Sequence, residues 1–505
     1  MSTRRPSPTP RSPLATLAFA TLALVVLIAA CASPTATRSV SITSHADGER
    51  VFGSRTITLA GTAANATEVQ VVLAGSVVET VAVVAGAFQA DVTLGDNANA
   101  IRVQTTDALV GDDVELVFPW VDATTFRPAD VVIGQVDDVS RTFGTSATQL
   151  GITSYGTPVF VGGILYVPDA SNNRILGFVG LPTADGAAAD FVLGQATFTA
   201  GTRNDDDQDG SPDLTPTART LSCPSAVASD GTRLFVADTC NRRVLIYDAL
   251  PTTSFAAADV VVGQATMTAT AYTPCSLDAP FSYSERLAVG GGKLVVPEPD
   301  GHRVLIWNSI PTVDGTEPDL VLGQPGAGGT CVQNDDDQNG AAGTPSARTL
   351  ADPWEAWTDG DRLLVADLTN HRVLLWASFP TSDFAPADVV IGQATMTTGM
   401  AGGGATGFEN AWTVASNGNQ ILVPDNLNNR VLVYDAFPTT NGVAADAVLG
   451  QGSFANATAN DDDQNGAQDA NPTARTMGAP YGSWMGEGVM VVNDSDNSRF
   501  LLYVD

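Results

Sequence analysis

Three short acidic loops carry side chains of the types that bind a metal ion. Each loop has the pattern Asp-x-Asp-x-(Asp or Asn)-Gly, beginning at Asp205, Asp335 and Asp461. In such a loop positions 1, 3 and 5 come close together, and the Gly permits the sharp bend that follows. Carboxylate and amide oxygens are the ligands that calcium prefers. The predicted calcium ligands are Asp205, Asp207, Asp209, Asp335, Asp337, Asn339, Asp461, Asp463 and Asn465.

The acidic loops resemble the first half of the calcium loops of several protein families, but they lack the residue that closes an EF-hand. Where an EF-hand has a bidentate Glu at position 12, the three loops have Pro216, Ser346 and Pro472. Asp213 and Asp469 could contribute at position 9 of two loops. The alternative is a solvated acidic insertion, neutralised by the Arg of the Ala-Arg-Thr phrase after each loop. We expect calcium because carboxylates this close repel one another without a cation.

A second candidate site is aromatic and falls at equivalent places in the internal repeats described below. Several Trp side chains with charged residues nearby suit a sugar or peptide ligand. Packing between repeats would explain the same Trp residues equally well. The predicted ligand-binding rim consists of Trp354, Trp357, Trp412, Tyr481, Trp484, Glu285 and Glu355.

Residues 124–505 contain a sequence motif, called the turn phrase below, that recurs six times. Each copy joins a strand to a turn of the form Asp-x-x-Asn-x-Arg, as in Asp169, Asn172 and Arg174, and an aromatic residue lies four places after the Arg. One copy departs at two positions, with Glu298 and Gly301 in place of Asp and Asn. A hydrophobic run ending in Gly-Gln also recurs, with Gln residues 60, 69, 60, 69 and 58 positions apart. The alternating spacing indicates three copies of a two-part unit.

These repeats predict an all-β fold whose main domain is a six-bladed β-propeller. Each period holds about four short strands, and one four-stranded sheet cannot bury both faces without neighbours. The turn phrase resembles the NHL repeat family over roughly residues 124–505. Six-fold recurrence indicates that the turn Asp, Asn and Arg are structural rather than catalytic. The last copy lacks the Gly-Gln phrase, so we expect residues 124–135 to pair with the final strands and close the ring.

Residues 39–120 show short alternating strands separated by turn residues such as Asp47 and Gly48. This pattern predicts a small β-sandwich in front of the propeller. The stretch from Val92 to Val103 resembles the bacterial immunoglobulin-like modules that follow export signals on surface proteins. The resemblance implies a spacer or adhesion role for this domain.

The N-terminal segment has the pattern of an export signal. Basic Arg4, Arg5 and Arg11 precede an uncharged apolar run that ends in Ile-Ala-Ala-Cys at Cys31. This ending resembles the lipobox of bacterial lipoproteins, which implies removal of residues 1–30, a lipid on Cys31 and a tether over residues 31–38. A plain secretory signal and a signal anchor are the alternatives. The expected location is the bacterial cell envelope, outside the cytoplasm, with the membrane as a partner through the lipid anchor.

Four Cys residues remain after Cys31. In an exported chain an even number of Cys suggests disulfides. The repeat register favours a bond between Cys223 and Cys240, which leaves Cys275 and Cys331 to pair with each other. Four free thiols are the alternative.

The composition and the number of His residues limit the classes of function that we expect. With 24 basic and 55 acidic residues among 505, the formal net charge is −31, which disfavours nucleic acid as a partner. Related propellers include lyases and lactonases, whose channel metals need converging His or carboxylates. The chain has only three His residues, His45, His302 and His371. We therefore expect a monomeric binding module for a protein, peptide or glycan, with no organic cofactor; the alternative is a propeller enzyme with a channel metal.

Overall fold

The structure is a computed structural model that describes residues 38–108, 110–151, 156–277, 281, 286–326 and 329–505. The predicted signal segment, Cys31 and Glu285 lie outside the described residues. In the part of the chain that is described, no helix is both long and apolar enough to cross a membrane.

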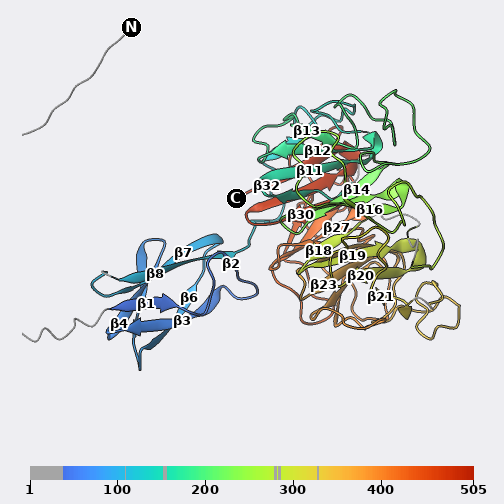
Figure 1. Cartoon of the computed structure of the whole chain (residues 1–505). Coiled ribbons are helices and arrows are strands. Elements are labelled where there is room, and N and C mark those ends of the chain that lie inside the picture. Colours follow the sequence, from blue (N-terminus) through green and yellow to red (C-terminus); the bar gives the residue numbers. More distant parts are fainter. Residues whose placement is uncertain (1–37, 109, 152–155, 278–280, 282–285, 327–328) are drawn as a thin grey trace, which may run out of the picture.

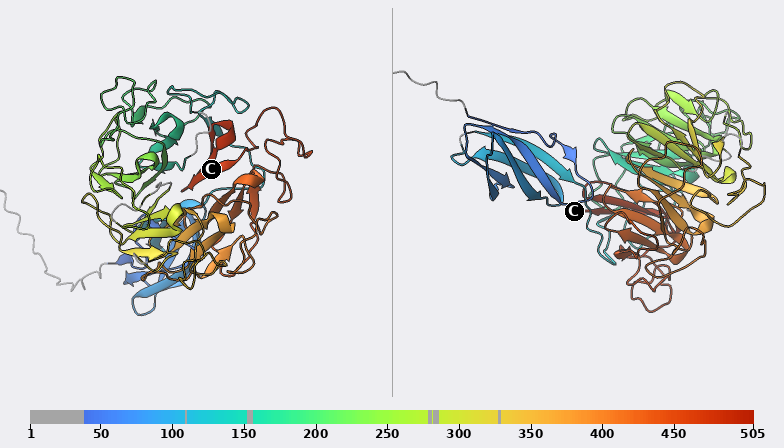
Figure 2. Two further views of the ribbon diagram at one scale, coloured as in Figure 1. Left: turned by 90° about the vertical axis from the view of Figure 1, so that its right-hand side faces the viewer. Right: turned by 90° about the horizontal axis from the view of Figure 1, so that it is seen from below.

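Six four-stranded sheets form the blades of a β-propeller, and they follow one another around a ring in sequence order (Figures 1 and 2). The first strands of successive blades contact one another, so they line the centre of the ring. These inner strands are β10 (Val159–Val161), β14 (Pro224–Ser229), β18 (Ala288–Gly290), β22 (Pro353–Thr358), β26 (Ala415–Ser416) and β30 (Pro480–Met485). The prediction of an all-β, six-bladed propeller is confirmed.

The other three strands of each blade lie progressively further from the centre and pair antiparallel throughout. The second strands are β11 (Ile164–Asp169), β15 (Leu234–Asp238), β19 (Lys293–Glu298), β23 (Leu363–Asp367), β27 (Ile421–Asp425) and β31 (Val489–Asp494). The third strands are β12 (Arg174–Val179), β16 (Arg243–Tyr247), β20 (Arg303–Trp307), β24 (Arg372–Trp376), β28 (Arg430–Tyr434) and β32 (Arg499–Val504). The outer strands are β13 (Phe191–Leu193), β17 (Val260–Val262), β21 (Leu320–Leu322), β25 (Val389–Ile391), β29 (Ala447–Leu449) and β9 (Val131–Ile133).

The sixth blade joins the two ends of the propeller. Its outer strand, β9, precedes the first blade in sequence and pairs antiparallel with β32, with Ile133 opposite Phe500. A ring closed in this way leaves neither end of the propeller as an unpaired sheet edge at this blade.

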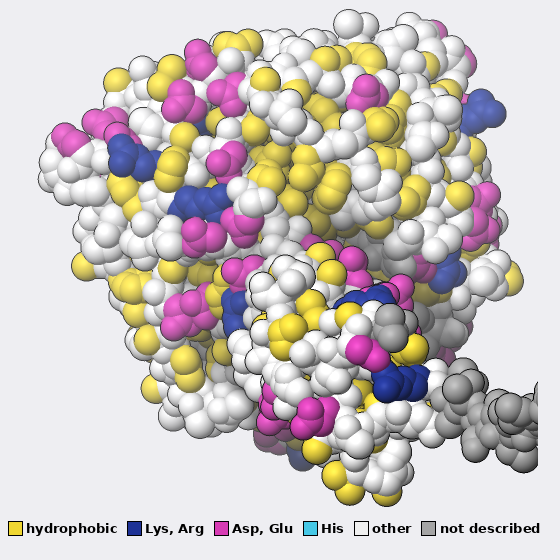
Figure 3. All heavy atoms as spheres, turned by 90° about the vertical axis from the view of Figure 1, so that its left-hand side faces the viewer, with side chains coloured by type: hydrophobic (Ala, Val, Ile, Leu, Met, Phe, Trp, Pro, Cys, Tyr) yellow, Lys and Arg dark blue, Asp and Glu magenta, His cyan; other side chains and the backbone are white. Residues whose placement is uncertain are grey.

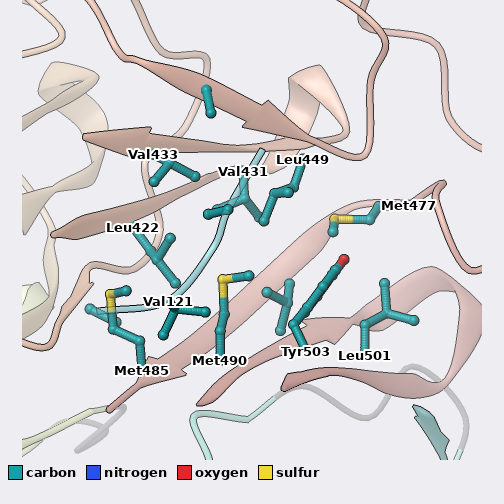
Figure 4. Packing of buried hydrophobic residues seen from close by; sticks show 14 of the residues in the cluster. Val121, Leu422, Val431, Val433, Leu449, Met477, Met485, Met490, Leu501 and Tyr503 are labelled. Atoms are coloured by element: carbon teal, nitrogen blue, oxygen red, sulfur yellow. The ribbon is translucent and has the colours of Figure 1, made fainter. Parts of the chain in front are cut away.

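The hydrophobic core is divided into layers between neighbouring blades. The layer between the fifth and sixth blades includes Leu422, Met485 and Met490. Val121, from the segment that connects the two domains, is fully buried and lies among these side chains (Figure 4). Because each sheet is covered on both faces by its neighbours, its strands are continuous apolar runs rather than alternating ones.

Residues 39–118 form two further sheets that enclose one shared hydrophobic core. One sheet has the order β1-β3-β6 and the other β2-β8-β7-β4-β5. Their strands are β1 (Ser39–Ile42), β2 (Glu49–Arg50), β3 (Thr56–Ala64), β4 (Glu68–Leu73), β5 (Ser76–Ala82), β6 (Ala87–Thr93), β7 (Asn97–Thr105) and β8 (Gly111–Phe118). In β6 exposed and buried residues alternate strictly, as expected for a strand with one face on a core. This small domain is called the sandwich below.

The sandwich contacts the propeller near the hairpin between β26 and β27. Asn419 in this hairpin accepts a hydrogen bond from the Gly53 amide at 2.7 Å and donates one to the Pro119 carbonyl at 3.0 Å. Gln420 exchanges two hydrogen bonds with the backbone of Val121, at 2.8 and 3.0 Å. The C-terminus lies at the same junction (Figure 2), where the Asp505 carboxylate accepts from the amide of Asp122.

Two disulfides are present in the propeller. Cys223 is bonded to Cys240, and Cys275 is bonded to Cys331. Stable disulfides form in oxidising compartments, so this pairing points to a location outside the cytoplasm.

Candidate functional site

The Asp-x-x-Asn-x-Arg turns connect the second and third strands of each blade, and the acidic residue and the Arg of each turn are buried. In the fourth blade, Arg372 Nε donates to Asp367 Oδ2 at 2.7 Å, and Asn370 Nδ2 donates to the same oxygen at 2.8 Å. The other guanidinium nitrogens of Arg372 donate to the carbonyls of Met396, Ser346 and Thr349. Each guanidinium nitrogen of Arg372 thus has a partner within the protein, which supports a structural role for these residues.

The two His residues of the propeller belong to the same turns. His302 and His371 occupy the left-handed position directly before the turn Arg, with φ of 51° and 49°. Their Nδ1 atoms accept hydrogen bonds from the amides of Asp352 and Asn410, at 3.1 and 3.2 Å. Burial lowers the pKa of His371, which favours the neutral ring that such an acceptor requires. Both His side chains therefore anchor loops.

In each acidic loop the first Asp is buried and organises the loop backbone. Asp205 accepts hydrogen bonds from the amides of Asp209 and Gly210, both at 3.0 Å. Asp335 and Asp461 make the equivalent pairs of bonds within their own loops. The loop is thus bent by its first Asp, and the remaining acidic side chains are left near its surface.

Two of the three acidic loops gather three carboxylates that could hold a metal ion. Asp205, Asp207 and Asp209 form one such triad, with ligand oxygens within 4.8 Å of one another. Asp461, Asp463 and Asp469 form the other, so the position 9 carboxylate joins here, while Asn465 donates a hydrogen bond to Asp463 at 2.9 Å. We call these groups the acidic triads.

The second acidic loop differs at position 9, where Gly343 replaces the Asp469 of the third loop. Asn339 Nδ2 donates to Asp337 Oδ2 at 2.9 Å, and Asp335 and Asp337 are the two carboxylates at its predicted ligand positions. Of the Arg residues that could neutralise the loops, Arg475 pairs with Asp462 of the third loop at 3.1 Å. The predicted ligands therefore separate into two strong candidate sites and one weaker one.

A polar cluster lies in the centre of the propeller channel. Glu355 on β22 accepts a hydrogen bond at 2.7 Å from Thr157 Oγ1, which comes from the opposite side of the ring. Arg286, fully buried just before β18, donates to the Ser225 carbonyl. Burial raises the pKa of Glu355 to about 7, while the positive charge of Arg286 acts in the opposite direction, as do hydrogen bonds from Thr157, the Val414 amide and Thr413.

Not all polar atoms of this cluster are satisfied. Glu355 is only 2% exposed, yet its Oε2 atom has no hydrogen-bond partner within the described residues. The same holds for Nε and Nη2 of Arg286. Buried polar atoms without partners are costly and are rare in native proteins, so this cluster is a candidate site for recognition or chemistry.

Three aromatic residues from neighbouring blades form a stack beside the polar cluster. Trp354 and Trp412 meet edge to face with ring centroids 4.6 Å apart, and Trp412 and Tyr481 lie 4.8 Å apart. The Arg286 guanidinium lies over the Tyr481 ring at 4.9 Å. The indole Nε1 atoms of both Trp residues are buried without a partner in the described part of the chain. Trp354, Trp412 and Tyr481 are called the aromatic collar below.

The other two Trp residues of the predicted rim lie further along the channel. Trp357 packs on Phe437 and Trp484 packs on Phe160, with ring centroids 5.5 and 6.3 Å apart. The structure therefore divides the predicted rim into the aromatic collar at one end of the inner strands and Trp357 with Trp484 towards the other.

Two cavities occupy the channel on the side of Trp357 and Trp484. The smaller, of about 110 Å³, extends to Glu355, and the larger, of about 730 Å³, reaches the sandwich. Arg50 and Phe52 of the sandwich line the larger cavity. Sequence reasoning missed these two residues because they lie outside the repeats. It also missed Thr157, although Thr157 and Glu355 occupy equivalent places in the first and fourth blades, which could have pointed to it.

The fold and its channel define a six-bladed β-propeller with a small β-sandwich at one end. No family model and no curated protein matches the chain. Solved structures similar to it include the computationally designed Ika8 protein, at 9% identity over 93% of this chain and 98% of that one, with a TM-score of 0.30. Another is the PQQ-bound aldose sugar dehydrogenase of Streptomyces coelicolor, at 12% identity over 75% of this chain and 100% of that one, with a TM-score of 0.36. A third comes from a nidogen/laminin complex, at 13% identity over 70% and 95% of the two chains, with a TM-score of 0.26.

Proposed function

We propose that this protein is a lipid-anchored binding module of the bacterial cell envelope, with a propeller of the NHL type and an immunoglobulin-like sandwich. Its ligand is a peptide, a protein segment or a glycan that lies against the aromatic collar. The observation that carries this proposal is the stack of Trp354, Trp412 and Tyr481 beside Arg286, in which two indole N–H groups have no partner among the described residues. Aromatic faces with a few hydrogen-bond donors suit sugars and peptides.

Binding is favoured over catalysis by the composition of the channel. Among the described residues, the groups of three or more metal-ligating side chains lie in the acidic loops, outside the channel. The polar cluster contributes one carboxylate, Glu355, which is fewer than a catalytic metal requires. One observation favours the alternative of a lyase or hydrolase: the pKa of Glu355 is raised to about 7, where a general acid or base works well.

Muropeptides offer a direct test of collar binding, because they combine a glycan with a peptide. We expect the protein to bind soluble muropeptides in isothermal titration calorimetry and expect Trp412→Ala to weaken that binding at least tenfold, since it removes the central ring of the collar. Trp484→Ala, at the other end of the channel, is the matched control and should bind as tightly as the unmodified protein. Absence of binding, or equal loss in both variants, would reject the collar as the site.

We further propose that calcium binds the acidic triads and stabilises the propeller. With a dissociation constant of about 10⁻⁴–10⁻³ M, typical of extracellular sites, 10 mM calcium would add about 1–3 kcal/mol per site. The melting temperature should therefore rise by several degrees between EDTA and calcium. The combined change Asp207→Ser and Asp463→Ser should abolish the rise, whereas Asp337→Ser in the loop without a triad should leave it intact. An identical melting temperature in EDTA and calcium would exclude these sites.

The membrane anchor rests on the lipobox-like sequence that ends at Cys31. We expect the protein expressed in a bacterial host to be found in the membrane fraction and to be released by detergent. Cys31→Ala should be found in the soluble or secreted fraction, because the lipid is the only strong membrane attachment that we propose. Unchanged membrane fractionation of Cys31→Ala would contradict the anchor.

A further inference from the structure

The two cavities adjoin each other in the channel. Both are lined by Trp357, Trp484 and Met485, so a ligand that extends past these side chains would occupy both. We call the smaller cavity the inner chamber and the larger one the vestibule. The vestibule, at about 730 Å³, lies within the range of about 300–1,000 Å³ that is usual for small-molecule sites.

The sandwich forms part of the vestibule wall. Phe52 lies so close to the Gly418 backbone that a Cβ atom added there would be 2.4 Å from the Phe52 ring. The Gly53 amide is hydrogen-bonded to Asn419, and Arg50 forms an ion pair with Glu487 at 2.5 Å. Hydrophobic side chains gather on the propeller face beside the sandwich (Figure 3). The two domains therefore enclose the space together, and the site is incomplete without the sandwich.

Charged groups in the vestibule already have partners. Three carboxylates line it, those of Asp230, Asp359 and Glu487, and each forms an ion pair with an Arg at 2.5–2.7 Å. A charged ligand would compete with an Arg at any of these positions. The vestibule is consequently suited to the uncharged, apolar part of a ligand, which its Trp rings would cover.

The inner chamber is different because two of its buried polar atoms lack a partner in the part of the chain that the structure describes. Its wall is mostly aliphatic and aromatic, but Glu355 Oε2 and Ser483 Oγ are both buried there without a hydrogen-bond partner in the described residues. Their residues are 2% and 1% exposed. An ionised carboxylate offers only acceptors, and a hydroxyl can accept as well, so the complementary group is a positively charged donor with several N–H bonds. The charge of Arg286 also acts on Glu355, but Arg286 is not among the residues that line this chamber. A bare metal ion fits poorly, because one carboxylate supplies too few oxygen ligands.

We propose that the inner chamber and vestibule bind a small organic amine in its protonated form. The ammonium group donates hydrogen bonds to Glu355 and Ser483, and the apolar body lies between Trp357 and Trp484 below Phe52 of the sandwich. This site rests on the proposed binding function and deepens it. The vestibule lies at the end of the channel away from the aromatic collar, and Glu355 lies between the two.

Phenethylamine is a suitable probe, with 2-phenylethanol and 3-phenylpropionate as the neutral and anionic comparisons. In isothermal titration calorimetry at pH 8 on the full mature chain, we expect the amine to bind at least tenfold more tightly than the alcohol, and the acid not to bind. Glu355→Gln should weaken amine binding at least tenfold. Phe52→Ala should weaken it about three- to tenfold; Phe52 is 40% exposed on the sandwich, so the propeller fold does not depend on it.

Trp412→Phe in the aromatic collar is the matched control and should bind phenethylamine normally. Equal binding of amine and alcohol, no detectable amine binding, or normal binding by both Glu355→Gln and Phe52→Ala would overturn the proposal. If Glu355→Gln does not fold, Phe52→Ala still decides whether the sandwich contributes. Muropeptide binding that persists without amine binding would reject this site alone, and the reverse result would reject the collar alone.

Discussion

The blade turns and the channel centre both bury charged side chains, but only the turns satisfy them. The five Asp–Arg pairs of the turns have N–O distances of 2.7–2.8 Å, and the Glu298–Arg303 pair has one of 3.1 Å. In the channel, Glu355 and Arg286 are buried equally deeply, yet both keep atoms without a partner among the described residues.

This contrast distinguishes the charged residues that stabilise the fold from those that are candidates for a functional site. A buried ion pair that uses all its donors and acceptors is expected wherever a fold needs a rigid turn, and six-fold repetition fits that role. The channel cluster occurs once and is not repeated from blade to blade, and buried polar atoms without partners are expected to lower stability, so the fold alone does not explain it. Functional sites are expected where a protein keeps an unfavourable local feature, such as a buried polar atom without a partner, that the fold does not require.

The largest expected effect comes from breaking one satisfied turn. Arg372→Met leaves the Asp367 carboxylate buried without its cation and removes three hydrogen bonds to loop carbonyls. Loss of one partner of a buried ion pair costs about 3–5 kcal/mol. We expect the free energy of unfolding in urea to fall by this amount.

The control for this change lies in the same blade. Arg348 is exposed, and Arg348→Met should alter the free energy of unfolding by less than about 0.5 kcal/mol. Equal stability of Arg372→Met and Arg348→Met would mean that the turns do not hold the blades, and the contrast with the channel would disappear.

The same contrast explains which features were predictable from the sequence. The turn Asn and Arg lie three and five positions after the Asp, and the pattern recurs around the ring with Glu298 and Gly301 as its departures. Both the contacts of these residues and the six-bladed fold can therefore be predicted from the sequence. Thr157 and Glu355 are 198 positions apart, and their hydrogen bond exists only because the ring brings opposite blades together. Gly53 and Asn419 are 366 positions apart and belong to different domains, so no repeat signals their contact.

The sequence predicted which residues belong to the candidate sites, but not which of these residues lie together in the structure. The repeat alignment places Trp354 and Trp357 near each other in sequence, but three residues of extended strand span about 10 Å, enough to separate the two ends of an inner strand. In the acidic loops, the pattern at positions 1, 3 and 5 predicts the triad of Asp205, Asp207 and Asp209. In the third loop Asp469 joins instead of Asn465, which depends on how the residues after the Gly fold back.

A smaller effect on the free energy of unfolding, and one of opposite sign, is expected for a substitution in the channel. Burial raises the pKa of Glu355 from 4.5 to about 7, so the folded protein binds this proton more tightly than the unfolded chain does. The stabilisation is fully present below about pH 4.5 and is lost as the pH rises through 7. A shift of this size corresponds to about 3 kcal/mol.

Glu355→Gln carries no titrating group and should lack this loss. Relative to the unmodified protein, its free energy of unfolding should therefore increase by about 3 kcal/mol between pH 4.5 and pH 8, measured by urea denaturation at both values. Glu115→Gln, at an exposed position of the sandwich, should show no comparable change. If the difference between Glu355→Gln and the unmodified protein is the same at both pH values, Arg286 offsets the burial of Glu355 completely, and the channel is as well satisfied as the turns. If the difference grows as expected and Glu355→Gln no longer binds the amine, the buried Glu355 carboxylate lowers the stability of the free protein and contributes to ligand binding.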